Sequence, residues 1–312
     1  MTQVAASRRP FGRLLTAMIT PFSADGTLDA AGAARLATWL VDVQGNDGLV
    51  ISGTTGESPT TSDAEKETLL RAVVEAVGDR AHVVAGVGTN DTRHTVELAH
   101  TAAKAGADGL LVVAPYYSKP PQAGLLQHFT AVADATDLPC MLYDVPHRTG
   151  IAIATDTLLR LAEHERVVAV KDAKGDLAQT GLVTRHGKLA VYSGDDALTL
   201  PLLSVGAVGV VGVPTHLFGQ QTKAMIRAYE NGDVSGALAL HHELLPAYLG
   251  FFKTQAVITT QAALNRLGLP AGPTRPPLVD ATDTELDTLT ADCRAAGLDL
   301  TAPDAATRGV AQ

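Results

Sequence analysis

One lysine of this chain stands where an amine could act as a nucleophile. Lys171 follows the apolar run Val167–Val170, and small and β-branched residues of this kind predict a short buried strand with the amine at its end. Burial in apolar surroundings favours the neutral form of a lysine. A neutral amine can condense with a ketone, and the protonated imine is then an electron sink for carbon chemistry. The residue type and its place therefore indicate an enzyme with an amine nucleophile.

Two further apolar runs end on groups that could assist such an amine. Cys140–Leu142 leads to Tyr143, whose phenol could carry protons during imine formation. Leu49–Ile51 leads to Gly53–Glu57, with the sequence Gly-Thr-Thr-Gly-Glu. The backbone amides of a glycine-flanked turn, together with two hydroxyls, suit a carboxylate. This turn has no lysine of a nucleotide-binding loop, which argues against a nucleotide.

The elements that position these groups alternate between strand and helix. Amphipathic stretches separate the apolar runs, and such alternation predicts a parallel sheet covered on both faces. Eight strands favour an α/β fold of the closed (β/α)8 TIM-barrel type over an open doubly wound sheet, whose glycine fingerprint is missing after the first strand. The expected strands are Leu14–Thr20, Gly48–Ser52, His82–Val87, Gly109–Ala114, Pro139–Tyr143, Val167–Lys171, Leu189–Ser193 and Gly209–Val213; the expected helices include Ala30–Val43, Ala64–Val77, Thr92–Ala105, Gln122–Thr136 and Thr155–Ala162.

Glycines mark the joints of the predicted barrel. Gly45, Gly106 and Gly206 each precede a strand in a recurring pattern, and each suits a left-handed residue at a helix end. We expect the barrel to occupy residues 12–231 and a C-terminal helical segment residues 232–298, with helices at Val234–Phe252, Thr254–Leu267 and Asp283–Ala296. Residues 1–11 and 299–312 are expected to be loose termini.

Composition limits the partners of the chain. The 312 residues carry a formal charge of −9, which argues against nucleic acid and anionic membranes as partners. No apolar run is long enough to span a bilayer, and the first residues lack the apolar region of a secretory signal. Cys140 and Cys293 form no disulfide framework, so we expect a cytoplasmic protein.

Four motifs carry a resemblance to a known family. They are Gly-Thr-Thr-Gly-Glu-Ser at Gly53–Ser58, Pro115–Tyr117, Tyr143–Gly150 with its arginine, and Val170–Asp172. Together they resemble the pyruvate-dependent Schiff-base lyases, and among these the dihydrodipicolinate synthase family. The resemblance covers about Gly12 to Ala296 and implies the TIM barrel with C-terminal helices.

The resemblance implies roles for the reactive residues. Lys171 would form the imine and Tyr143 would donate and accept protons. Thr54 and Tyr117 would connect Tyr143 to solvent as a proton relay. In the family the tyrosine that matches Tyr117 reaches into the site of a neighbouring subunit, which implies a homotetramer built from tight dimers.

The resemblance also implies the substrates. Thr55 and the backbone carbonyl of Val211 would hold pyruvate, and Arg148 would grip the carboxylate of L-aspartate 4-semialdehyde. The implied reaction is their condensation, a step of lysine and diaminopimelate biosynthesis, without metal or organic cofactor. Two alternatives stay open: another pyruvate-dependent aldolase of the family, acting on a sugar acid or a specialised metabolite, and a non-catalytic regulator that binds a keto acid.

The chain departs from the family at the pocket where lysine inhibits some members. Ser58 and Asn90 match that pocket, but Asp63, Lys66 and His94 replace its other residues, so we expect weak or absent inhibition by lysine.

Two further sequence features have consequences for the site. The stretch Ala256–Gln261 stands where relatives commonly have Asn-Pro-x-Pro-x-Lys, which affects the rim of the site or the contacts between subunits. Asp195 and Asp196 are expected to cap a helix that begins at Ala197.

Overall fold

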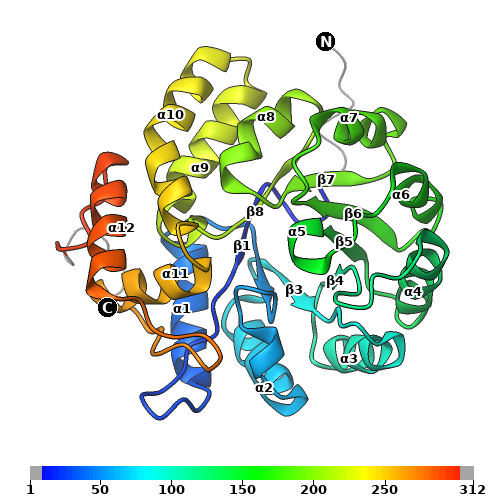
Figure 1. Ribbon diagram of the computed structural model, residues 1–312, viewed down its shortest axis with the longest axis horizontal. Coiled ribbons are helices and arrows are strands. Elements are labelled where there is room, and N and C mark those ends of the chain that lie inside the picture. Colours follow the sequence, from blue (N-terminus) through cyan, green and yellow to red (C-terminus); the bar gives the residue numbers. More distant parts are fainter. Residues whose placement is uncertain (1–8, 303–312) are drawn as a thin grey trace.

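Eight short, buried strands pair in parallel in sequence order and close into a barrel in the computed structural model, which describes residues 9–302 (Figure 1). Their apolar residues face the barrel interior on one side and the helices on the other, as buried parallel strands require. The predicted TIM barrel is therefore confirmed. The strands are β1 (Leu14–Ala17), β2 (Gly48–Ile51), β3 (His82–Gly86), β4 (Gly109–Val113), β5 (Cys140–Asp144), β6 (Val167–Asp172), β7 (Ala190–Ser193) and β8 (Gly209–Gly212).

Helices surround the barrel and connect successive strands (Figure 1). The helices named from the sequence end within two residues of the predicted positions. The segment directly after β5 forms the one-turn helix α5. The helices between and after the strands are α1 (Ala30–Asp42), α2 (Asp63–Val77), α3 (Thr92–Lys104), α4 (Gln122–Asp134), α5 (Pro146–Thr149), α6 (Thr155–Leu161), α7 (Leu177–His186), α8 (Thr199–Ser204) and α9 (Thr215–Glu230).

Local signals fix where these helices begin and end. The hydroxyl of Ser62 accepts from the backbone of Glu65 while the Glu65 carboxylate accepts from the backbone of Ser62, a capping box that starts α2. Gly45, Gly106 and Gly206 have φ of +71°, +89° and +100°, which confirms the predicted left-handed joints before β2, β4 and β8.

Buried side chains at both chain ends correct one prediction. Phe11 is buried against the inner cluster of the barrel, and its backbone N–H donates to the Tyr192 hydroxyl at 3.3 Å. Leu300 is also buried. The packed chain therefore extends further at both ends than the predicted loose termini, of which residues 1–8 and 303–312 lie outside the described residues.

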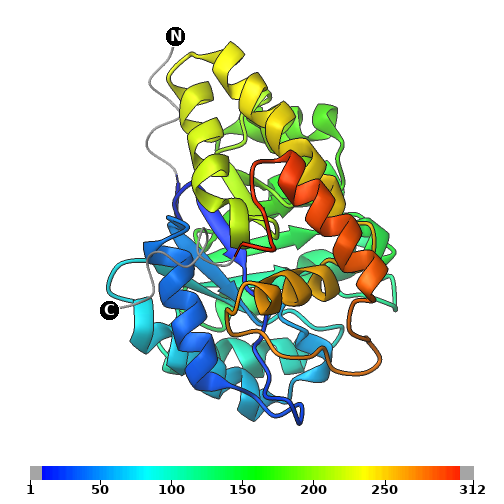
Figure 2. The same ribbon diagram turned by 90° about the vertical axis from the view of Figure 1, so that its left-hand side faces the viewer.

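Three helices follow the barrel. They are α10 (Val234–Phe251), α11 (Ala256–Arg266) and α12 (Asp283–Ala295). Figure 2 shows α10 beside α9 and α12 beside α10, with α11 crossing toward the mouth of the barrel. Across residues 9–302 we find no helix with the length and apolarity to cross a membrane.

Candidate active site

Lys171 lies at the carboxyl end of β6 and is almost wholly buried, with 5% of its surface exposed. Burial lowers the pKa of its amine from 10.5 to about 8, the charge of Asp196 opposes this shift, and the charge of Arg148 adds to it. Desolvation dominates because an ammonium loses its hydration in this setting. A substantial fraction of Lys171 is therefore neutral, and so nucleophilic, near pH 8.

Tyr143 is the neighbour of Lys171 across the strands. The two residues are paired in register between β5 and β6, and the Lys171 Nζ lies 4.4 Å from the centroid of the Tyr143 ring. Burial raises the pKa of the phenol to about 12, partly offset by the charge of Arg148 and a hydrogen bond with Thr54. The phenol is therefore protonated at neutral pH and can donate a proton beside the amine.

The turn after β2 brings Thr54 and Thr55 to the same end of the barrel. Ser52 adopts a left-handed φ of +58°, which bends the chain directly after the strand. Gly86 of β3 makes room for this bend, because a Cβ at that position would lie 2.6 Å from the Ser52 carbonyl oxygen. Glu57 closes the turn with another left-handed φ, of +53°. Strained residues at a strand end are typical of a functional site.

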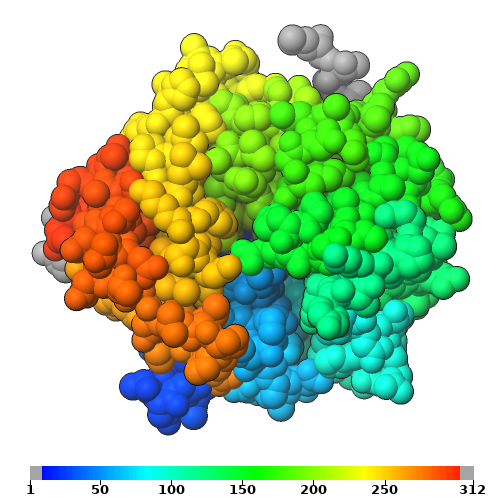
Figure 3. Space-filling model, viewed as in Figure 1, coloured from blue at the N-terminus to red at the C-terminus, as the bar shows by residue number. Residues whose placement is uncertain are grey.

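A cavity of about 460 Å³ opens at this end of the barrel and contains both reactive side chains. Figure 3 shows the hollow in the middle of the molecular face, between blue N-terminal segments, green central segments and the yellow and orange C-terminal segments. A second hollow of about 330 Å³ shares Thr54, Tyr143 and Arg148 with the first and extends to Tyr117. Thr55 lines the first cavity. Five of the seven residues singled out from the sequence thus line the first cavity, and a sixth, Tyr117, lines the second.

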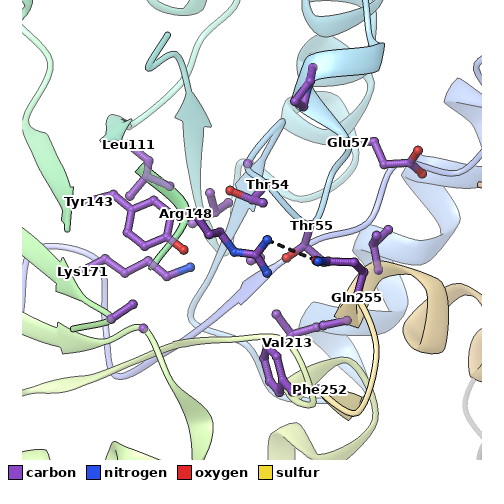
Figure 4. Close-up of a pocket in the computed structure, with 18 of the residues that line it drawn as sticks. Thr54, Thr55, Glu57, Leu111, Tyr143, Arg148, Lys171, Val213, Phe252 and Gln255 are labelled. Atoms are coloured by element: carbon purple, nitrogen blue, oxygen red, sulfur yellow. Dashed lines mark hydrogen bonds between the residues drawn. The ribbon is translucent and has the colours of Figure 1, made fainter. Parts of the chain in front are cut away.

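Arg148 points across the first cavity from α5. Its Nη1 donates to the Gln255 Oε1 at 3.1 Å, and Figure 4 shows the guanidinium between Tyr143 and the C-terminal segment. Phe252 and Gln255 contribute a wall from the loop between α10 and α11. An arginine here presents paired donors to a carboxylate on a ligand that enters the cavity.

Two predicted site residues stand apart from this group. Tyr117 is 90% exposed in the single chain, with a left-handed φ of +73°, and faces the second hollow. Val211 is fully buried inside the barrel opposite Leu15, and it is Val213, two residues later, that lines the first cavity.

The two adjacent aspartates have different environments. Asp195 accepts from the backbone N–H of Ala197 at 3.0 Å, so its predicted capping role is confirmed. The prediction for Asp196 is wrong: its carboxyl is fully buried and its Oδ2 accepts from the Val213 backbone N–H at 3.1 Å. Burial raises the pKa of Asp196 to about 7. Its side chain thus holds Val213, which directly follows β8 and lines the cavity, rather than a helix.

Glu57 is a cavity residue to which the sequence assigned no role. Its carboxylate accepts from the Gln261 side chain at 3.2 Å and from the Arg275 backbone N–H at 2.9 Å. Burial raises its pKa, partly offset by these hydrogen bonds. These contacts connect the Gly-Thr-Thr-Gly turn to the C-terminal segment. The sequence indicated this role only by placing a glutamate directly after the turn.

The described residues offer a lysine amine, a phenol, hydroxyls and a guanidinium around one cavity. Within residues 9–302 no group of three or more His, Cys, Asp or Glu side chains could hold a metal ion. The arrangement can form an imine with a carbonyl compound, exchange protons through the phenol, and bind carboxylates.

The chain is similar over most of its length to proteins of one family. Residues 10–296 match the dihydrodipicolinate synthetase family. The 4-hydroxy-tetrahydrodipicolinate synthase of Acidothermus cellulolyticus is 71% identical over 288 residues, which are 92% of this chain and 93% of that protein. The 4-hydroxy-tetrahydrodipicolinate synthase 2 of Streptomyces coelicolor is 60% identical over 300 residues, 96% of this chain and 100% of that protein. The crystal structure of DHDPS from Cyanidioschyzon merolae with lysine bound has a TM-score of 0.91 and 42% identity, covering 93% of this chain and 100% of that chain.

Proposed function

The chain belongs to the dihydrodipicolinate synthetase family, and we propose that it condenses pyruvate with L-aspartate 4-semialdehyde through an imine on Lys171. As a member of this family it is a lyase. The observation that carries the proposed chemistry is the buried Lys171 amine beside the Tyr143 phenol, with Nζ 4.4 Å from the ring centroid.

The proposed sequence of steps uses side chains of the protein and atoms of the two substrates. The neutral Lys171 amine attacks the ketone carbon of pyruvate, and water leaves as the iminium forms. The pyruvate methyl group then loses a proton, and the resulting enamine carbon attacks the aldehyde carbon of the semialdehyde. The amine of the semialdehyde finally displaces Lys171 and closes the ring, which returns the lysine for another turnover.

Tyr143 supplies and removes protons in this scheme. Its pKa of about 12 keeps the phenol protonated until a step requires a proton. The charge of Arg148, which lowers that pKa, stabilises the phenolate when the proton has left. Thr54 would pass protons onward, and the exposed Tyr117 would complete the relay from a neighbouring subunit.

The carboxylates of the two substrates would bind at opposite sides of the reacting carbons. Thr55 and the backbone carbonyl of Val211 are proposed to contact pyruvate. Arg148 is proposed to bind the carboxylate of the semialdehyde from the rim, where its partner Gln255 holds the guanidinium over the cavity.

Assembly and compartment are also proposals. A homotetramer of tight dimers is favoured by the exposure of Tyr117 and of apolar side chains on α7 and α10, such as Leu182 and Leu238. Sedimentation velocity measures it directly. The cytoplasm is favoured because Cys140 and Cys293 are buried free thiols.

The proposed reaction is tested with purified protein and a panel of acceptors. Pyruvate with L-aspartate 4-semialdehyde should give the cyclic product, whereas sugar aldehydes should give none. Turnover of a sugar aldehyde without turnover of the semialdehyde would move the assignment to another aldolase of the family. Binding of pyruvate without any turnover would indicate a regulator.

A further inference from the structure

A buried ion pair lies at the ends of the strands that carry the two reactive side chains. Asp144 follows Tyr143 on β5, and Lys174 comes three residues after Lys171. The Lys174 Nζ lies 3.1 Å from the Asp144 Oδ2, and the two side chains are 6% and 0% exposed. We call these two residues the Asp144–Lys174 pair.

The pair fastens together the strands that carry the reactive groups. Asp144 is in register with Asp172, one step beyond the register pair of Tyr143 and Lys171. The Asp144 carbonyl oxygen accepts from the Ala173 backbone N–H at 2.9 Å. Any shift of β5 against the segment after β6 therefore moves the phenol relative to the amine.

Further hydrogen bonds hold both ends of the pair. The second oxygen of the Asp144 carboxylate, Oδ1, accepts from the Ile153 backbone N–H at 3.1 Å. The Asp172 carboxylate accepts from the Lys174 backbone N–H at 3.0 Å and from the Thr180 hydroxyl at 2.5 Å. Hydrogen bonds thus hold the backbone of the segment directly after Lys171 in place.

Fold stability alone does not account for such a pair. Two charges removed from water lose hydration that their attraction only partly returns, and buried ion pairs often stabilise no more than apolar residues of the same size. Burial raises the pKa of Asp144 in spite of the opposing effect of Lys174. A raised folded-state pKa means that the ionised carboxylate is less favourable in the folded chain than in the unfolded one.

We propose that the Asp144–Lys174 pair positions the Tyr143 phenol against the Lys171 amine and, by keeping its two charges matched, leaves the charge balance around that amine undisturbed. This inference rests on the proposed roles of Lys171 and Tyr143. Both members of the pair are positioning residues, because they act through their neighbours.

The charge balance around Lys171 is set by few groups. Asp196, on the short 3-10 helix after β7 (Asp196–Leu198), favours the ammonium, Arg148 on α5 disfavours it, and Tyr143 on β5 faces it with its ring. A pair with no net charge adds little to this balance. One unmatched member would add a full charge at the buried strand ends beside the amine, where the dielectric constant is low.

Single substitutions should therefore shift the titration of Lys171 in opposite directions. Asp144→Asn leaves the Lys174 ammonium unmatched and should lower the pH at which the amine becomes reactive. Lys174→Met leaves the Asp144 carboxylate unmatched and should raise that pH. Each shift should be on the order of half a pH unit to one unit. A loss of packing alone has no reason to produce opposite signs.

The test measures imine formation with pyruvate, trapped by borohydride across pH, together with kcat for the condensation. The double variant Asp144→Asn/Lys174→Met should restore the wild-type midpoint, since it has no net charge, yet lose tenfold or more in kcat because the fastening is gone. Lys174→Arg should keep the midpoint and lower kcat. Glu163→Gln, which breaks the exposed pair of Glu163 with Lys188, is the matched control and should change neither quantity.

The inference would be overturned if the double variant kept the wild-type kcat. It would also be overturned if the trapping midpoints of the two single variants shifted in the same direction or did not shift. If a single variant does not fold, the kcat values and trapping midpoints of the double variant and of Lys174→Arg test the inference. Failure of the wild type to be trapped by pyruvate would instead refute the proposed function, so the two failures are distinguishable.

Discussion

Replacing Arg148 by alanine separates binding of the second substrate from formation of the imine. The guanidinium lies over the cavity and donates to Gln255, but it does not touch Lys171 in any hydrogen bond or ion pair found in residues 9–302. The variant should therefore still form the imine with pyruvate. It should lose the grip on the semialdehyde carboxylate.

The expected loss follows from the cost of removing one partner of a charge pair. Losses of about 2–5 kcal/mol are typical for buried pairs, which correspond to roughly 30- to 5,000-fold. Arg148 is exposed in the single chain, so solvent screening places the loss at the lower end, and kcat/KM for the semialdehyde should fall roughly 30- to 300-fold.

Replacing Arg148 by alanine should also change the pKa of the Lys171 amine. Arg148 lowers the pKa of Lys171, so its removal should raise that pKa above about 8 and move the midpoint of imine trapping to higher pH. The comparison is therefore made at pH values well above the midpoint, where both proteins have a neutral amine. Trapping should there proceed to the same extent in variant and wild type.

The assay combines borohydride trapping with steady-state kinetics for both substrates. Arg148→Lys retains the charge and should keep the trapping midpoint while binding the carboxylate less well. Arg71→Ala removes an exposed helix arginine paired with Glu67 and serves as the control. Equal losses in trapping and in condensation would refute the reasoning, because Arg148 would then support the structure rather than bind the acceptor.

Three further outcomes are expected. Tyr143→Phe should lower kcat by roughly 100- to 10,000-fold in steady-state assays, as expected for loss of a general acid–base, and activity within threefold of wild type would exclude the proton role. Lysine should inhibit weakly or not at all, because two of the positions that match the lysine pocket of relatives already have partners within the chain: the Lys66 ammonium donates to the Thr61 carbonyl and His94 pairs with Asp63. Submillimolar half-inhibition in a kinetic titration would contradict this. Burial lowers the pKa of His216 from 6.5 to about 4, so the unfolded chain binds this proton more readily and stability falls between pH 6.5 and about 4. In urea titrations at pH 7 and pH 4.5, His216→Gln should reduce that fall by up to roughly 3 kcal/mol, and an unchanged fall would contradict the assignment.

The barrel and its reactive centre could be predicted because their signals are local. Lys171 and Tyr143 each end an apolar run, and strand ends of a parallel barrel meet at one face whatever the lengths of the connections. The predicted ends of the two strands were therefore enough to place both side chains at the same face of the barrel.

Contacts between distant segments could not be predicted in this way. Asp195 and Asp196 are adjacent in the sequence, yet one caps a helix and the other is buried against β8, 17 residues away from its hydrogen-bond partner Val213. Gln255 meets Arg148 across 107 residues of chain. Such pairings depend on how the C-terminal segment folds over the barrel mouth, which no local pattern specifies.

The buried Asp144–Lys174 pair belongs to the same class of contact. In the sequence, Lys174 stands only three residues after Lys171, and nothing there assigns it a carboxylate partner. The structure distinguishes the two, because Lys174 is hydrogen bonded to a carboxylate while Lys171 faces the cavity.

The central claim is that the buried Lys171, whose amine has a lowered pKa, forms the imine, and trapping with pyruvate across pH tests it most directly. Borohydride should add one reduced pyruvyl group per chain, peptide mapping should place it on Lys171, and the extent of trapping should rise with a midpoint near pH 8. Lys171→Ala should abolish the adduct. An adduct on Lys174, no adduct, or a midpoint near the ordinary lysine pKa of about 10.4 would contradict the account.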